Sequence, residues 1–304
     1  MSDILIRALS FIICIGLGYF LRLRGTVTKE NAAVFSKVVM NITLPAAILA
    51  SASTLSFSAT MWLPLLLGFL MNIVMDAIGV FEARKASRVN RGAGLVQISG
   101  YNIGTFTLPF IQAFFPTSYL ATALLFDTGN ALMVLGGNYT LAASAVVHKG
   151  KVDIGFILKN LFSSIPFAIY MLSFFLTALG LSFPSPVISL IQIAADANPF
   201  LAMLMLGMMM DFRLQKGELA RLCKLLTIRL GANALIAIAL YIFLPVPLIM
   251  RQMLVICLMS PISIVAPVYA LKLGSDKAEA ANLNSLCILA SLAIMTGLIV
   301  LFAH

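Results

Sequence analysis

Residues 100–110, GYNIGTFTLPF, place an asparagine, two glycines, two threonines and a proline inside a long apolar run. Proline removes a backbone donor and clashes with the preceding turn, so Pro109 should free a carbonyl group near Thr105. Unpaired backbone groups are costly in lipid and are tolerated where protein or a watery cavity surrounds them. We therefore expect this stretch to break a membrane helix beside a cavity.

The surrounding chain has the composition of an integral membrane protein. Of its 304 residues, 61% are hydrophobic and 10% are charged, whereas soluble domains carry about 25% charged residues. The four cysteines and two histidines form no motif typical of a disulfide framework or a zinc site, so we expect no bound metal and no cofactor. The net charge of +9 could suggest nucleic acid binding. The placement of the basic residues explains this charge better, and we expect no nucleic-acid partner.

A helix that spans a bilayer needs about 20 mostly apolar residues, and we place ten such segments. They are predicted at residues 3–22, 31–52, 60–81, 93–115, 118–146, 155–180, 186–211, 220–244, 249–272 and 279–302. Eighteen of the 20 Lys and Arg residues lie in or beside the odd-numbered connections, and only Arg7 and Arg251 lie elsewhere. Basic residues mark the cytoplasmic side. We therefore expect both termini outside, and no Lys or Arg near the bilayer centre.

Ten spans divide into two halves of five, which we place at residues 1–150 and 151–304. An odd number of spans per half gives the halves opposite orientations, a recurring design of secondary transporters. Polar residues or prolines recur in spans two and seven, four and nine, and five and ten. The predicted fold is all-α, with two inverted five-helix repeats whose broken helices four and nine cross near the midplane. Spans one, three, six and eight are plainer and suit a scaffold or lipid-facing role.

The break in span nine, SPISIVAP at residues 260–267, matches the break in span four. The N-terminus of each half-helix offers free N–H donors and a partial positive charge, so two such ends can hold a carboxylate without a basic side chain. Nearby polar side chains would add donors and acceptors. The candidate substrate-binding residues are Asn41, Asn102, Thr105, Thr107, Pro109, Asn130, Ser260, Pro261, Ser263 and Pro267.

Two aspartates are candidates for coupling transport to protons or Na⁺. Asp127 and Asp196 each lie about ten residues into a predicted span, and a carboxylate at that depth is usually protonated, paired or functional. Asn198 and Asn282 are further candidates for this role. The alternative is that these side chains are hydrogen-bonded structural groups that fix helix packing.

Three further features have structural interpretations. Asp76 lies closer to the inner interface, where Asn72, one turn earlier, could be its partner. The methionine-rich stretch 203–211 is typical of packing filler rather than of a metal site. Gly207 within it should allow two helices to approach closely.

Four motifs, taken in order, resemble the auxin efflux carrier family, particularly its short bacterial members. They are NITLPAAIL (41–49), NIGTFTLP (102–109), LMLGMMMD (204–211) and SPISIVAPVYALKLGSD (260–276). The resemblance implies a fold like that of sodium/bile-acid symporters, with a scaffold domain, a transport domain and a site at the crossing of spans four and nine. By position, Asn102 and Pro109 match the family's first break, and Pro261 and Pro267 match the second. The proline pair is one residue farther apart here than in plant members, and their long central loop is absent.

The resemblance also implies a function. The expected activity is secondary transport, with export favoured, of a small organic anion such as a carboxylate or dicarboxylate by alternating access. A symporter or antiporter coupled to Na⁺ or protons is the alternative, and a channel is a third. No HExxH or GxSxG motif indicates an enzyme. The expected location is the bacterial cytoplasmic (inner) membrane, and a homodimer is plausible by resemblance.

Overall fold

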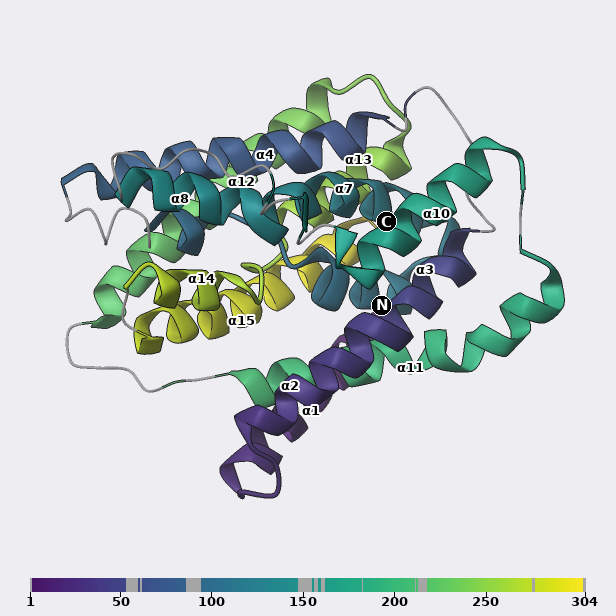
Figure 1. Ribbon diagram of the computed structural model, residues 1–304, viewed down its shortest axis with the longest axis horizontal. Coiled ribbons are helices and arrows are strands. Elements are labelled where there is room, and N and C mark those ends of the chain that lie inside the picture. Colours follow the sequence, from purple (N-terminus) through teal and green to yellow (C-terminus); the bar gives the residue numbers. More distant parts are fainter. Residues whose placement is uncertain are drawn as a thin grey trace.

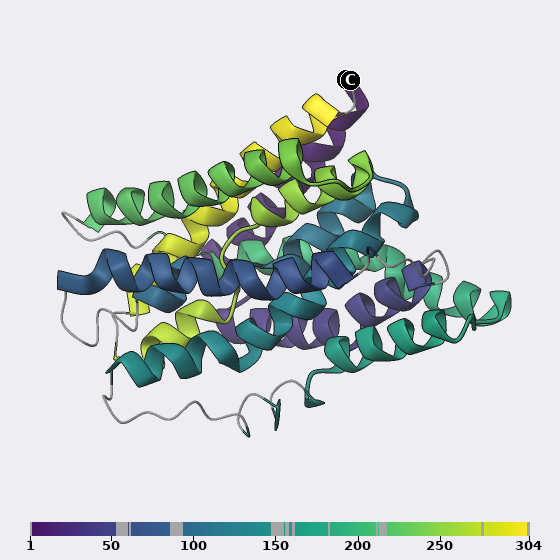
Figure 2. The ribbon, with the colours of Figure 1, turned by 90° about the horizontal axis from the view of Figure 1, so that it is seen from above.

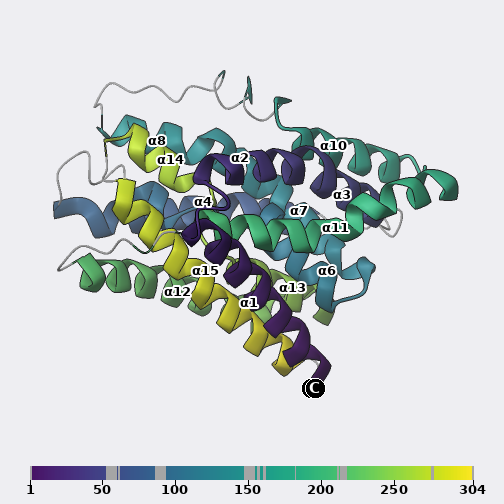
Figure 3. The same ribbon diagram turned by 90° about the horizontal axis from the view of Figure 1, so that it is seen from below.

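The computed structural model describes residues 2–52, 60, 62–85, 94–146, 155, 158–159, 162–181, 183–210, 212, 218–274 and 277–302. This part of the chain is helical and contains no strand. Its helices pack into one bundle (Figure 1). The beginning of α1 and the end of α15 lie together at one end of the bundle (Figures 2 and 3).

Some helices run without interruption and others are divided. The uninterrupted helices are α1 (Ser2–Leu23), α4 (Trp62–Glu82), α10 (Ile165–Ala178), α11 (Ser185–Met209), α12 (Glu218–Phe243) and α15 (Lys277–Phe302). The divided spans contain α2 (Lys29–Val38) with α3 (Leu44–Ala52), α6 (Leu108–Phe114), α7 (Leu120–Leu132) with α8 (Asn138–Val146), and α13 (Leu248–Leu258) with α14 (Ala266–Lys272). Three π-helical turns adjoin them: η1 (Val39–Thr43), η4 (Ile103–Thr107) and η6 (Met133–Gly137).

Within the described residues, seven helices are long and apolar enough to cross a membrane. They coincide with predicted spans one, two, three, five, seven, eight and ten. Spans four and nine are missing from this set because each is broken, and span six because its described helix, α10, has 14 residues. The chain is thus an all-helical integral membrane protein, while the count of ten spans and the inverted repeat remain predictions.

The helices pack as two groups. In the first helix group, α1, α2 and α3 lie against α11, and α10 lies against α3 (Figure 3). In the second helix group, α4 lies along α7, α13 packs on α7 and α12, and α15 packs on α12 and α14. The helices α4 and α12, from spans three and eight, therefore support the broken spans directly, which their plain sequences did not indicate. The short helix α6 touches both groups, since it contacts α7, α11 and α1.

Glycines bring two helix pairs into backbone contact. A Cβ atom on Gly207 of α11 would lie 1.9 Å from the carbonyl oxygen of Ile15 in α1, so the expected close approach is confirmed. On Gly129 of α7, a Cβ atom would lie 1.8 Å from the carbonyl oxygen of Leu65 in α4. Small residues permit this close packing between membrane helices. The methionines beside Gly207 are buried, as expected for packing filler: Met203, Met205 and Met208.

Both expected breaks are present, and they touch. Span four leaves its first helical segment at Gly100, whose φ of +76° is strained for residues with a side chain. It resumes at η4, and Pro109 lies in the first turn of α6, where its missing N–H costs little. Span nine is open between α13 and α14. The Asn102 N–H donates to the Pro261 carbonyl at 2.9 Å, which joins the two breaks at a point we call the crossing.

Candidate functional site

A cavity of about 90 Å³ lies beside the crossing, between the two helix groups. The first group and the segment before α10 contribute Met40, Leu44, Ser164, Pro166, Phe167 and Tyr170. The second group and the two breaks contribute Tyr101, Asn102, Ile103, Gly104, Thr105, Asp127, Asn130, Ala131, Val134, Leu135, Ser263, Ile264 and Val265. All three π-helical turns named above supply lining residues. Such turns are frequent at functional sites because they reshape one turn of a helix.

Backbone from both breaks faces this cavity. Ile103, Gly104 and Thr105 form the first turn that follows the break in span four, and the N–H groups of a first helical turn have no acceptor within their own helix. Residues 263–265 precede α14 and line the same cavity. These are the helix ends that carry partial positive charge. The cavity wall next to the crossing is therefore suited to an anionic group.

Asn102 offers an unused donor to the cavity. Its side chain is 4% exposed, and its Oδ1 atom accepts a hydrogen bond from the Thr105 hydroxyl at 2.5 Å. Its Nδ2 atom has no hydrogen-bond partner in the described part of the chain. A buried donor without a partner costs free energy, so a ligand that accepts this hydrogen bond would remove that cost.

Asp127 is the charged side chain in the lining. Its Oδ2 atom accepts from the Tyr170 hydroxyl at 2.6 Å, and its Oδ1 atom accepts from Asn130 Nδ2 at 3.0 Å. Tyr170 belongs to α10 of the first helix group, and Asp127 belongs to α7 of the second. Their hydrogen bond therefore spans the boundary between the groups, inside the cavity.

Asn130 connects this carboxylate to the crossing. Its amide exchanges two hydrogen bonds with the backbone of Tyr101, at 3.2 Å and 2.9 Å. Its Oδ1 atom also accepts from Asn72 at 3.0 Å, and Asn72 in turn accepts from Asn138 at 3.1 Å. Asn72 therefore pairs with Asn130, and the expectation that it pairs with Asp76 is wrong. Asp76 is buried, and neither of its carboxylate oxygens has a hydrogen-bond partner among the described residues.

The expectation of no basic side chain deep in the bundle is also wrong. Arg229 is the twelfth of the 26 residues of α12 and is 1% exposed. The prediction from charge groups Arg229 with the basic residues of the seventh connection, although it is the tenth residue of predicted span 220–244. Three backbone carbonyls at the two breaks accept hydrogen bonds from its two terminal nitrogens, which offsets part of the cost of burying the charge. Its Nε atom has no hydrogen-bond partner among the described residues.

The remaining predicted substrate residues lie outside the cavity lining. Thr107 and Ser260 form a short hydrogen bond between their hydroxyls, which links span four to span nine. The proline rings of both breaks shape the helix ends nearby and do not line the cavity. Asn41 lies on η1 with an exposed side chain. Of the ten candidates, the cavity brings together Asn102, Thr105, Asn130 and Ser263.

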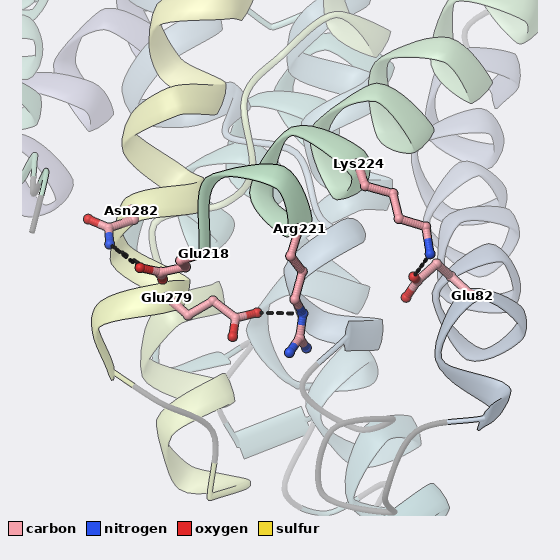
Figure 4. Close-up of polar contacts among 6 residues, drawn as sticks. All are labelled: Glu82, Glu218, Arg221, Lys224, Glu279 and Asn282. Atoms are coloured by element: carbon pink, nitrogen blue, oxygen red, sulfur yellow. Dashed lines mark hydrogen bonds and ion pairs between the residues drawn. The ribbon is translucent and has the colours of Figure 1, made fainter. Parts of the chain in front are cut away.

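The predicted ion-coupling residues are dispersed. The Asp196 side chain is exposed and accepts from Gln192 at 2.7 Å, so the expected burial of this carboxylate is wrong. Asn198 is buried and accepts from Thr43 at 3.0 Å, which joins α11 to η1. Asn282 donates to Glu218 at 3.4 Å in a separate polar cluster (Figure 4). Only Asp127 of the four lines the cavity.

The cluster in Figure 4 fixes the first turns of α12. Besides the Asn282 contact, Arg221 pairs with Glu279 of α15 at 3.3 Å, and Lys224 pairs with Glu82 of α4 at 2.9 Å. The helix is thus tied to two neighbours of the second helix group. Exposed pairs of this kind contribute little stability individually. Together they hold the register of the helix that carries Arg229.

Sequence reasoning missed three side chains that shape the site: Tyr101, Tyr170 and Arg229. Tyr170 lies among apolar residues, and Tyr101 stands directly before Asn102 in the opening stretch. In both cases only the fold shows which carboxylate or amide the hydroxyl reaches. Arg229 did give a signal, because it lies ten residues inside a predicted span while the other basic residues of the seventh connection lie closer to its start.

Comparison with known proteins agrees with this architecture. Residues 4–149 match a protein family described as "Membrane transport protein". None of the curated proteins compared with the chain matches it. The family match extends over the first five predicted spans and includes the break in span four with the lining residues Asn102, Asp127 and Asn130. The match covers slightly less than half of the chain, and it agrees with the resemblance of the four motifs to the auxin efflux carrier family of membrane transport proteins.

Proposed function

We propose that the chain is a secondary transporter of a small organic anion, such as a carboxylate or dicarboxylate, which binds in the cavity beside the crossing. The observation that carries this proposal is the unpaired Asn102 amide, buried next to the first turn of η4. A donor and a partially positive helix end together attract a carboxylate. The volume of about 90 Å³ favours a cargo of few heavy atoms.

The position of the cavity supports alternating access. Its walls come from both helix groups, so a movement of one group against the other would open it toward one side of the membrane at a time. The Tyr170–Asp127 hydrogen bond would break during such a movement, because its two partners belong to different groups. Transporters with broken helices commonly use this kind of relative motion.

Export remains the proposed direction, and the bacterial inner membrane the proposed location. An inside-negative membrane potential drives a negative charge outward by about 2.3 kcal/mol per charge per 100 mV. A carrier of an anion needs no other energy source for net export. A homodimer stays part of the proposal by resemblance alone.

Proton-coupled transport of the anion is the second candidate function, and Asp127 favours it. An ionised carboxylate in the cavity repels an anionic cargo, and the repulsion is strong in a site shielded from water. Protonation of Asp127 would remove that repulsion, so a proton and the anion would occupy the cavity together. Direct coupling at Asp196 is not part of this proposal, because its side chain is exposed outside the cavity.

The proposal is tested by ligand binding to the purified protein. A panel of organic anions, with and without sodium, is screened for an increase in melting temperature, and the best anion is then titrated against Asn102→Ala. Loss of one hydrogen bond to a charged ligand costs about 1.5–3 kcal/mol, so binding should weaken about 10- to 100-fold. Asn41→Ala, an exposed asparagine near the same cavity, is the matched control and should bind normally.

Two results would contradict the proposal. Equal affinity of Asn102→Ala and the wild type would remove the assigned site. Single-channel currents through the purified protein in planar bilayers would identify a channel in place of a carrier.

A further inference from the structure

The guanidinium of Arg229 lies where both broken helices end. It donates to the carbonyl oxygens of Ile98 and Gly100 in span four, the latter at 2.8 Å, and to that of Ser260 in span nine at 3.2 Å. We propose that the Arg229 guanidinium occupies a cation-binding position at the crossing, and that its removal opens this position to a small monovalent cation.

The oxygens that Arg229 holds are of the kind that binds cations. In secondary transporters with broken helices, unwound backbone carbonyls and the C-terminal ends of half-helices coordinate coupling cations such as Na⁺. Here α13 ends at Leu258, and Ser260 lies two residues later. Its C-terminal end carries partial negative charge. The guanidinium thus occupies the negative side of the crossing, opposite the helix beginnings that line the cavity.

The surroundings hold the guanidinium in one position. Its Cζ atom lies 5.0 Å from the centre of the Tyr101 ring, a cation–π contact. The Tyr101 hydroxyl donates at 2.8 Å to Asn233, which lies one turn after Arg229 on α12. Residues of α12 therefore hold the same short segment of span four by its carbonyls, its ring and its hydroxyl.

The position of Arg229 makes it a positioning residue. It does not line the cavity, so it acts on a cargo through the crossing that it joins. The planar guanidinium can bind several acceptors at fixed angles, which an ammonium group cannot do. Asp76 of α4 is a second buried ionisable side chain in this part of the bundle.

Removal of the side chain would leave three carbonyl oxygens facing the space that the guanidinium had occupied. Buried acceptors without partners are costly, so a cation able to enter that space should restore stability. Guanidinium fits the vacated position by shape, and Na⁺ fits the carbonyl chemistry. This inference concerns the crossing and holds whatever the cargo is.

The test compares melting temperatures of the purified full-length protein in sodium chloride, guanidinium chloride at millimolar concentration, and choline chloride at equal ionic strength. The variants are Arg229→Ala and Arg229→Gln, the second of which keeps one donor and so protects folding. Arg251→Ala is the matched control. Arg251 also donates to a backbone carbonyl, that of Tyr241 at 2.9 Å, and lies 5.7 Å from the same residue's ring, but away from the crossing.

Both Arg229 variants should melt about 5–10 °C below the wild type in choline. Guanidinium or sodium should recover at least half of this loss, whereas the wild type and Arg251→Ala should show the same melting temperature in all three salts. A merely structural arginine would lower stability without any specific response to the cation.

Two outcomes would overturn the proposal. One is an Arg229 variant whose melting temperature is the same in all three salts. The other is a wild type that sodium stabilises relative to choline, because its cation position would then not be filled by Arg229. Neither outcome depends on an anionic cargo, so failure of this proposal is distinguishable from failure of the proposed transport function.

Discussion

In the proposed mechanism, Asp127 takes part in both anion binding and the relative movement of the two helix groups. Its carboxylate shares the cavity with the unpaired Asn102 amide, and it accepts the Tyr170 hydroxyl from the other helix group. The same group can therefore sense a proton, repel or admit an anion, and hold the two helix groups together. A substitution that separates these roles is the most informative one at this scale.

Asp127→Asn should make anion binding independent of pH. In the wild type, acidification protonates the carboxylate and removes its negative charge, so binding should strengthen as pH falls. The amide carries no charge at any pH and should bind the anion as well in mild alkali as in acid. The measurement is a binding titration across pH with an anion whose own charge stays constant over the range.

Tyr170→Phe is the matched control for this substitution. It removes the same hydrogen bond between the helix groups but keeps the carboxylate. Its binding should retain a pH dependence. If anion binding to Asp127→Asn depends on pH as it does in the wild type, the responsible proton binds to another group.

At the residue scale, the sequence named several residues that line the candidate cavity but not their hydrogen-bond partners. Asn102, Thr105, Asn130, Ser263 and Asp127 could be named because polar residues are conspicuous in an apolar span. Their partners could not, since a hydrogen bond between residues 43 positions apart depends on how helices pack. Asp196 illustrates the limit, because depth in a span does not tell which side of the helix faces the protein.

At the scale of elements, glycines determine how closely helices approach. The backbone of α7 lies directly against that of α4 at Gly129, and the cavity residues Asp127 and Asn130 flank this contact. A change in the spacing of the two helices would therefore displace the lining of the cavity. Gly231 of α12 differs, because nothing lies within 4 Å of the position of its missing Cβ atom.

Gly129→Ala should lower the melting temperature by at least about 5 °C, because overpacking costs about 1–3 kcal/mol. It should also weaken anion binding through the displaced lining. Gly231→Ala is the control and should leave both quantities unchanged, since the added methyl group meets no atom. A Gly129→Ala protein as stable as Gly231→Ala would show that α4 and α7 do not pack this closely.

The helix ends were predictable and the π-helical turns were not. The sequence placed both breaks correctly because prolines and glycines leave a local signature in an apolar run. The turn at Val39–Thr43 is followed by Pro45, at the spacing that Pro109 has after η4, and the turn at Met133–Gly137 contains two glycines. Neither signal by itself distinguishes a π-helical turn from a kink.

At the scale of the whole molecule, the orientation in the membrane is predicted from the distribution of charged residues. Both described ends of the chain lie at the same end of the bundle, as an even number of spans requires (Figure 2). The side of the membrane follows only from the distribution of Lys and Arg. The expected cytoplasmic side of α12 contains Cys223, an exposed native thiol.

Cys223 should react with a membrane-impermeant maleimide only after cells are permeabilised. The other cysteines are buried or half-buried, so they supply little background, and Cys223→Ser is the control. An N-terminal epitope tag should be accessible in intact spheroplasts. Labelling of Cys223 in intact cells would reverse the predicted orientation.

The grouping of the helices could not be read from the sequence. The composition of spans three and eight suits a scaffold or lipid-facing role, and the structure shows in addition that α4 and α12 pack on the divided spans. Composition shows which helices are apolar enough to face lipid. It does not show which helices pack against each other. The family match does not show how the helices are grouped either, and only the structure does.

The glycine contacts have a mechanical consequence. The closest of them join helices within a group, α1 to α11 and α4 to α7, where backbone meets backbone. Gly104 faces Leu44 of the other group, whose side chain can rotate aside, and the Asp127 side chain of its own group. Each group should therefore behave as a stiff body, and the seam between them should be compliant. Thermal motion would then displace the two groups relative to each other along the surface that lines the proposed cargo site. The helices that line the site would keep their shape.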